Sequence, residues 1–179
     1  MERAAKRRLP SAYAVSNWVD DDVLVGNAPY DATSFDAILS MGVTRFVCLC
    51  SWNELHFDYI EHLTDEHAIH YEPIRDRHVA PDSRAVFIAQ WIIDQTTAGN
   101  RVYVHCLGGI GRAGTIASLY LGLRHGYDAE DAMRAVNESR QTRRFLNHPK
   151  IFSPESDCQR DQVRRILKAE NEYNWGSHT

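Results

Sequence analysis

Two short and almost uninterrupted apolar runs constrain the fold of this chain most. They read TRFVCLC at 44–50 and RVYVH at 101–105, and both are rich in β-branched and aromatic residues. Strands that are apolar on both faces are typical of parallel sheets with helices on either side. Segments with helical periodicity lie before, between and after these two runs, at 31–41, 82–99 and 113–125. The sequence therefore predicts an α/β fold, with a central, mostly parallel sheet of about 4–5 strands and helices on both of its faces.

The rest of the chain gives a simple domain organisation. We expect further strands at 22–26 and 69–74, and further helices at 52–67, 129–140 and 155–173, the last opened by Pro154. The length of 179 residues suits one domain of ordinary size, and no repeat or linker interrupts it. We therefore predict a single domain over 13–175 that follows a flexible basic tail at 1–12.

Charge and cysteine usage restrict the class of protein. The net charge of −4 makes bulk binding of nucleic acid a poor expectation, and no apolar run is long enough for a membrane anchor. The four cysteines are unevenly spaced, which favours reduced thiols over a disulfide framework or a metal site. We expect a monomer without metal or cofactor, located in the cytoplasm with the nucleus as an alternative.

The segment HCLGGIGR at 105–112 carries the strongest functional signal. Cys106 follows a buried strand, at the edge where parallel sheets bind ligands. The glycines after it allow a loop whose backbone N–H groups turn inward, and the next helix adds its positive end, so the loop suits an anion. Arg112 presents a planar fork that matches two phosphate oxygens. Because these groups favour a thiolate, we predict that Cys106 attacks phosphorus and forms a phosphocysteine.

This segment resembles the H-C-x-x-G-x-x-R signature of the cysteine-dependent protein tyrosine phosphatases. The flanking segments NWVDDDVLVGNAP, MGVTRFVCL and SPESDCQ are similar to segments of the small dual-specificity branch, so that the resemblance covers about 15–170. It implies that the signature loop connects the last strand to a helix. It also implies that Cys106 is the nucleophile, that Arg112 holds the phosphoryl oxygens, and that His105 orders the loop. The substrate-binding cradle would be completed by the backbone amides of Leu107, Gly108, Gly109, Ile110, Gly111 and Arg112.

The resemblance also requires a general acid about thirty residues before the cysteine. Asp76 fits this spacing and is preferred, while Asp82 is the alternative, although it also fits a helix cap. Arg75 and Arg77 flank Asp76. In an extended loop they would point away from it, either toward a negative substrate or into solvent.

Two positions carry further expectations. Ala113 stands where most members of the family have Ser or Thr, whose hydroxyl donates to the cysteine sulfur, and this departure implies slow turnover. Cys50 resembles the backdoor cysteine of related lipid phosphatases and regenerating-liver phosphatases. It would form a reversible disulfide with Cys106 under oxidation, or serve only as a buried thiol.

The substrate class follows from the residues near the loop. None of the five residues between Cys106 and Arg112 is basic, which disfavours an inositol-lipid substrate. The long connection at 141–153 contains Arg143, Arg144 and Lys150, which either flank the pocket or face solvent. We predict a phosphatase for phosphotyrosine and for phosphoserine or phosphothreonine in a protein or peptide. The alternatives are a phosphatase for inositol phosphates, phosphoinositides or RNA 5′ ends, and a slow enzyme that acts mainly as a phosphate-dependent binding module.

Overall fold

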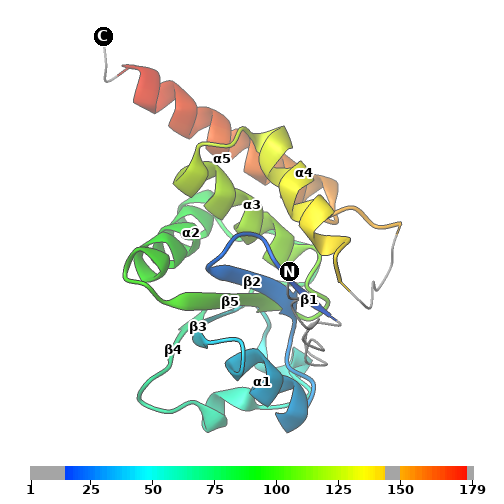
Figure 1. The fold of residues 1–179 in the computed structure, drawn as a ribbon. Coiled ribbons are helices and arrows are strands. Elements are labelled where there is room, and N and C mark those ends of the chain that lie inside the picture. The colour runs from blue at the N-terminus through cyan, green and yellow to red at the C-terminus, as the bar shows by residue number, and fades with distance from the viewer. Residues whose placement is uncertain (1–14, 144–149, 177–179) are drawn as a thin grey trace, which may run out of the picture.

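A five-stranded sheet separates two layers of helices in the computed structural model, which describes residues 15–143 and 150–176 (Figure 1). In spatial order the strands are β1 (Ser16–Trp18), β2 (Val23–Asn27), β5 (Arg101–Cys106), β3 (Val43–Cys48) and β4 (Ala68–Tyr71). Only β1 is antiparallel to its neighbour. The predicted α/β class and mostly parallel sheet are confirmed.

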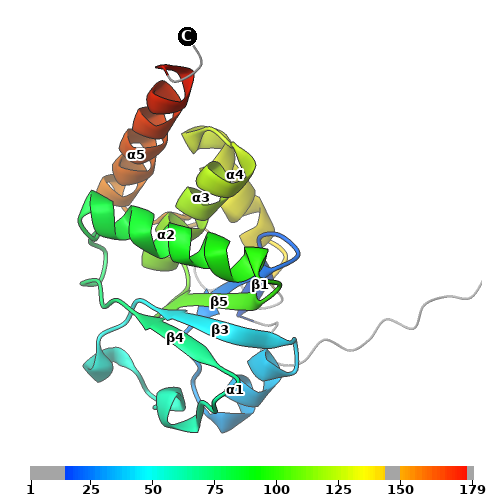
Figure 2. The same ribbon diagram turned by 90° about the vertical axis from the view of Figure 1, so that its left-hand side faces the viewer.

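The helices cover both faces of the sheet, as predicted (Figure 2). One face carries α1 (Ala32–Leu39) and the segment with two short 3₁₀ helices, Trp52–Glu54 and Tyr59–His62. The other face carries the larger layer: α2 (Asp82–Thr97), α3 (Arg112–His125), α4 (Ala129–Arg140) and α5 (Asp157–Gly176). Within the described residues, no helix combines the length and apolar character that a membrane crossing requires.

Because side chains alternate between the two faces along the central strands, the core is divided into two clusters. Leu24, Phe46 and Tyr103 pack with α1, whereas Val25, Val47 and Val104 pack with the larger helical layer. Successive side chains of a strand point to opposite faces, so each apolar run feeds both clusters. This confirms the prediction that the runs at 44–50 and 101–105 are strands covered on both sides.

The strand register gathers the functional segments at one edge of the sheet. Asn27 pairs with Cys106 and Cys48 pairs with His105, so β2, β5 and β3 end at the same level. Because all three strands run in the same direction, the segments that follow them meet at this edge. The loop after β5 leads directly into α3, which places the signature loop between the last strand and a helix.

The structure corrects several predicted boundaries. The segment 52–67 is not one helix. Its first short turn ends where the backbone becomes extended at Leu55, and Asp58 begins the second by accepting a hydrogen bond from the amide of Ile60. The strand predicted at 69–74 ends at Tyr71, and α5 begins at Asp157, after Pro154. Strand β1 was not predicted, because three residues of mixed polarity give no periodic signal. The predicted tail at 1–12 lies outside the described residues.

Candidate active site

Cys106 lies on the wall of a small cavity at the carboxyl edge of the sheet. The cavity has a volume of about 300 Å³ and is lined by Asp76, Cys106, Leu107, Gly108, Ile110, Gly111, Ile151 and Glu155. It thus brings together the predicted nucleophile, most of the predicted loop and the preferred acid. Cys106 as a residue is 3% exposed.

The carbonyl groups of the loop are held from outside. Each carbonyl oxygen from Leu107 to Gly111 accepts a hydrogen bond. The oxygen of Leu107 accepts from the amide of Ala28 (3.3 Å), and that of Gly108 accepts from the side-chain amide of Asn27 when its nitrogen is oriented toward the carbonyl oxygens (3.0 Å). The oxygens of Gly109, Ile110 and Gly111 accept from Arg143 (2.9 Å), from the hydroxyl of Ser153 (2.7 Å), and from the amide and hydroxyl of Thr115 (both 2.9 Å), respectively. In a planar trans peptide the C=O and the following N–H point in opposite directions. The amides of residues 108–112 therefore turn toward the concave side of the loop, where they can bind an anion.

Gly109 is the glycine that the loop conformation requires most. Its φ is +63°, in the left-handed region that side chains rarely adopt, and a Cβ there would overlap the backbone of Gly26. The loop consequently packs directly against strand β2. No other residue would allow both the turn and this approach.

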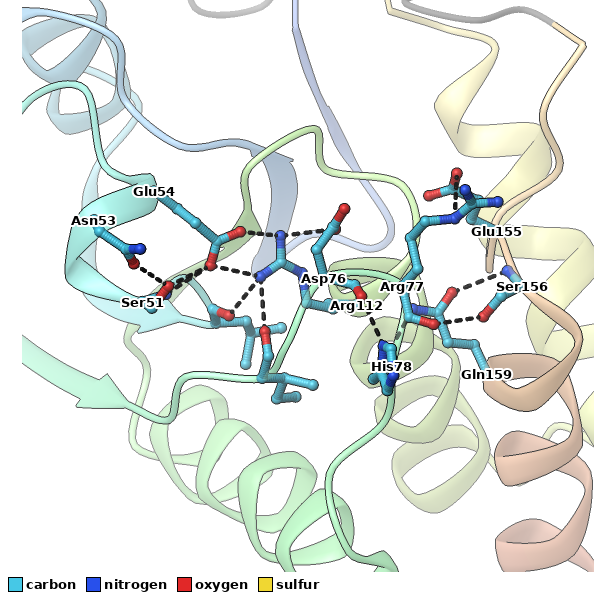
Figure 3. A network of polar contacts seen from close by, with 12 residues as sticks. Ser51, Asn53, Glu54, Asp76, Arg77, His78, Arg112, Glu155, Ser156 and Gln159 are labelled. Atoms are coloured by element: carbon cyan, nitrogen blue, oxygen red, sulfur yellow. Dashed lines mark hydrogen bonds and ion pairs between the residues drawn. The ribbon is translucent and has the colours of Figure 1, made fainter.

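Arg112 is the first residue of α3, and its guanidinium is almost completely buried. Nη1 donates to the carbonyl oxygens of Leu49 at 3.2 Å and Ile74 at 2.8 Å. The carboxylate of Glu54 accepts from Nη1 at 3.0 Å and from Nη2 at 2.7 Å (Figure 3). Nε is buried and has no partner among the described residues, so it remains a donor for a bound anion.

Glu54 is a functional candidate that the sequence analysis missed. Partial burial raises the pKa of its carboxyl, but the hydrogen bonds from Arg112 and Ser51 outweigh burial and hold this pKa at about 2. In return, Glu54 and the nearby Cys106 raise the pKa of Arg112 against the opposing effect of its burial. The pattern Ser51-x-x-Glu54 was visible as a capping box, and the structure has that box, but the distant partner of the carboxylate was not visible.

Asp76 lies beside Arg112 in a tight turn. Its carboxylate accepts from Nη2 of Arg112 at 3.0 Å, and its side chain is 64% exposed (Figure 3). The expected extended loop is wrong, since the amide of His78 donates to the carbonyl of Arg75 and Arg77 has a φ of +61°. Arg77 turns toward Glu155, with 3.7 Å between the charged groups, and neither flanking arginine lines the cavity.

Asp82, the alternative acid, lies outside the cavity at the start of α2. Both of its oxygens accept from Arg165 at 2.7 Å, and these hydrogen bonds lower the pKa of Asp82. Its carboxylate is occupied in joining α2 to α5. The structure thus leaves Asp76 as the only one of the two aspartates near Cys106.

Aromatic residues pack against His105, the residue that precedes Cys106. The buried ring of His105 contacts the hydroxyl of Tyr59, with 2.7 Å between Nε2 and the oxygen, and stacks on Tyr103. The hydroxyl of Tyr103 donates to the carbonyl of Asn27 at 2.6 Å. These contacts connect the residue before Cys106 to the layer containing α1, and sequence reasoning gave no sign of Tyr59.

The cysteines and Ala113 take different environments. Cys48, Cys50 and Cys106 are buried in one apolar cluster, whereas Cys158 is exposed, and all four are free thiols. A hydrogen bond with Cys48 and, to a smaller extent, burial raise the pKa of the Cys50 thiol. Ala113 is fully buried and provides no hydroxyl next to the loop. Within the described ranges, no group of side chains is arranged to hold a metal ion.

In the basic connection at 141–153, Lys150 faces solvent as one alternative expected, but Arg143 differs from both expectations. Arg143 neither flanks the cavity nor faces solvent, but is buried under the loop, where it donates to Asn17, Val25 and Gly109. Lys150 is exposed, and Arg144 lies outside the described residues. Sequence reasoning named Arg143 but did not predict its burial, because a basic residue in a long connection is usually solvated.

The fold of this chain is similar to that of known proteins. Solved structures of similar fold include Tk-PTP in the active form (20% identity, 86% of this chain and 97% of that chain, TM-score 0.73), PTPMT1 in complex with PI(5)P (18%, 89% and 98%, 0.72) and DUSP15 (18%, 88% and 90%, 0.69). The family model described as "Swiss Army Knife protein, DSP-PTPase phosphatase domain" matches residues 13–163, which is most of the chain. The chain therefore belongs to this DSP-PTPase family, PTP-SAK, and is a cysteine-dependent phosphatase.

Proposed function

We propose that this phosphatase hydrolyses phosphotyrosine, and also phosphoserine or phosphothreonine, in proteins through a phosphocysteine at Cys106. The observation that carries the proposal is the convergence on one cavity of a cysteine, a loop with inward amides and an aspartate beside a buried arginine. A thiolate in such a cradle can attack a bound phosphoryl group, and the amides and guanidinium can hold its equatorial oxygens.

The proposed reaction has two steps. The sulfur of Cys106 attacks phosphorus, the bond from phosphorus to the leaving oxygen breaks, and the carboxyl of Asp76 gives its proton to that oxygen. Water then attacks the phosphocysteine, Asp76 takes a proton from the water, and inorganic phosphate leaves with regeneration of the thiolate. Since Ala113 offers no hydroxyl to the departing sulfur, we expect the second step to be slow.

The walls of the cavity favour a protein substrate over a polyphosphorylated one. Leu107, Ile110 and Ile151 supply apolar surface, and Glu155 adds a carboxylate near Asp76. These carboxylates would repel the additional phosphates of an inositol polyphosphate or an RNA 5′ end.

A second cavity supports the same substrate class. It has a volume of about 400 Å³, shares Leu107 and Gly108 with the first, and includes the exposed ring of Tyr30. A peptide whose phosphorylated side chain enters the first cavity would have an apolar neighbour within reach of the second. The ring of a phosphotyrosine in the substrate would suit the apolar wall of the first cavity.

The test begins with hydrolysis of an aryl phosphate by the wild type, Cys106→Ser and Asp76→Ala. We expect no hydrolysis by Cys106→Ser and a decrease in kcat of about 100-fold or more in Asp76→Ala. Cys158→Ser is the matched control, since it removes an exposed thiol outside the cavity, and it should behave like the wild type. Hydrolysis that survives in Cys106→Ser would overturn the mechanism.

A substrate panel then tests the finer assignment. It compares phosphotyrosine and phosphothreonine peptides with PI(5)P vesicles, an inositol polyphosphate and an RNA with a 5′ triphosphate. We expect the highest kcat/KM on the peptides. A higher value on PI(5)P or RNA would replace the protein substrate, and tight peptide binding without phosphate release would indicate a binding module.

A further inference from the structure

Arg143 is a buried cation outside the residues assigned to the reaction. Its side chain lies in the interior, where Nε donates to Oδ1 of Asn17 at 2.6 Å. Nη2 donates to the carbonyl oxygens of Gly109 at 2.9 Å and Val25 at 3.3 Å. Arg143 thus joins β1 and β2 to the signature loop.

The hydrogen-bond acceptors around Arg143 are neutral. In the part of the chain that the structure describes, no carboxylate forms an ion pair with it, in contrast to Arg112 and its partner Glu54. Burial lowers the pKa of Arg143 to about 10, so that the guanidinium is still charged at neutral pH. A buried charge with no counter-charge is normally costly to a fold. The charge of Arg143 next to the loop is therefore expected to serve the loop and not the stability of the fold.

Gly109 is the point where Arg143 acts on the loop. Among the five groups that hold the loop carbonyls, Arg143 is the one that carries a charge. Because the Gly109 carbonyl and the Ile110 amide belong to one peptide plane, holding the oxygen from outside directs the N–H to the concave side. Gly109 has no side chain of its own to restrain this peptide.

The surrounding charges make Cys106 the natural counter-charge. Among the described residues, Tyr103, Arg140 and Cys106 are close enough to Arg143 to shift its pKa, and of these three a Cys106 thiolate is the group that would be negative at neutral pH. Cys106 shares its cavity with Asp76 and Glu155, and it lies close enough to Arg112 and Cys50 to shift their pKa values. Asp76 and Glu155 work against an anion in the cavity, so a second cation on the far side of the loop would offset them.

We infer that Arg143 is a positioning residue of the phosphate site, which anchors the Gly109 peptide and adds a second positive charge behind the loop. This inference rests on the proposed function, because it assigns the site a bound phosphate and a thiolate. The thiolate and the phosphate of the substrate then provide the negative charge that Arg143 lacks in the fold itself.

The experiment measures the local charge at Cys106 without turnover. Iodoacetate is an anion and iodoacetamide is neutral, while both alkylate the same sulfur, so the ratio of their rates reports the potential at the thiolate. The rates are measured in Cys158→Ser protein, and peptide mass spectrometry restricts them to Cys106. We compare Arg143→Met, Arg143→Gln and Arg143→Lys.

Arg45→Met is the matched control. Arg45 is half-buried on β3 and also donates only to neutral oxygens, those of Gln95 (2.9 Å), Thr44 (3.0 Å) and Glu66 (2.9 Å). It lies near the end of the sheet opposite to Cys106, because its partner in β5 is Val102, close to the start of that strand. Its removal should destabilise the fold in a similar way without changing the charge at the loop.

We expect the ratio of iodoacetate to iodoacetamide rates to fall about three- to tenfold in Arg143→Met and Arg143→Gln. Arg143→Lys, which keeps the charge, and Arg45→Met should stay within about twofold of the parent protein. An unchanged ratio in either neutral variant with a native circular dichroism spectrum would overturn the inference, and so would a loss in Arg143→Lys equal to that in Arg143→Met. Because alkylation needs no hydrolysis, failure of the proposed function on all phosphate esters would be seen separately.

Discussion

Replacement of Glu54 by Gln tests how the buried arginine of the active site is held in place. Glutamine keeps the shape of the side chain, but it loses the charge and places an NH₂ group against a guanidinium. Arg112 would then have Asp76 as its only carboxylate partner in the described structure, and that side chain is 64% exposed. We expect a loss of both stability and activity, since the orientation of the guanidinium depends on the two-point contact with Glu54.

The magnitude follows from the carboxylate itself. Its pKa is about 2 in the folded protein, against an ordinary value of 4.5. Each unit of such a difference corresponds to about 1.4 kcal/mol, so the charged form contributes about 3 kcal/mol to the free energy of unfolding at pH 7. Because the folded-state pKa is lowered, this contribution is complete above about pH 4.5 and is lost as the pH falls toward 2.

The assay is urea unfolding of the wild type and Glu54→Gln at pH 7, 5, 4 and 3, with Glu66→Gln as the control. Glu66 is exposed, and only its backbone oxygen is seen to accept a hydrogen bond. We expect a difference of about 3 kcal/mol at pH 7 that shrinks steadily below pH 4.5, and none for the control. A difference that stays constant between pH 7 and 3, or one below about 0.5 kcal/mol at pH 7, would refute the reasoning.

Three further substitutions test other parts of the site. Gly109→Ala should lower the free energy of unfolding by about 3 kcal/mol or more, because φ is positive and the added methyl group overlaps β2. Tyr59→Phe should lower it by about 1–3 kcal/mol, since it leaves the buried ring of His105 without its hydroxyl partner. Ala113→Ser should raise kcat on a small aryl phosphate by about fivefold, the equivalent of one modest hydrogen bond to the sulfur of Cys106.

Each of these has a clear contrary result. Denaturant unfolding of Gly109→Ala at wild-type stability would mean that the loop can move away from β2. A Tyr59→Phe protein as stable as the wild type would remove the support assigned to that hydroxyl. An unchanged or lower kcat for Ala113→Ser would show that the buried alanine does not limit the second step.

The elements with strong periodicity were predictable from the sequence. The buried strands at 44–50 and 101–105 and the helix at 129–140 were found within a few residues of their observed bounds, because their apolar patterns are regular. The segment 52–67 was misread, since its short turns are set by side chains that bind nearby backbone. Periodicity alone did not show that a new turn begins at Asp58, after the backbone becomes extended at Leu55.

The candidate site was predictable where its residues are close in the sequence. The loop from Cys106 to Arg112 is one continuous segment, and Asp76 was reached by spacing. Glu54 and Arg143 act on that loop from far along the chain, and no periodicity links them to it. Their burial depends on the whole packing of the sheet, which only the structure supplies.

The central claim is that Cys106 carries the phosphoryl group during turnover. Rapid acid quenching of the wild type with an aryl phosphate, followed by peptide mass spectrometry, tests it most directly. We predict that one phosphoryl group appears on the peptide that contains Cys106, accumulates because breakdown is slow, and is absent in Cys106→Ser. A phosphoryl group on another residue, or product release by Cys106→Ser at the wild-type rate, would contradict the account.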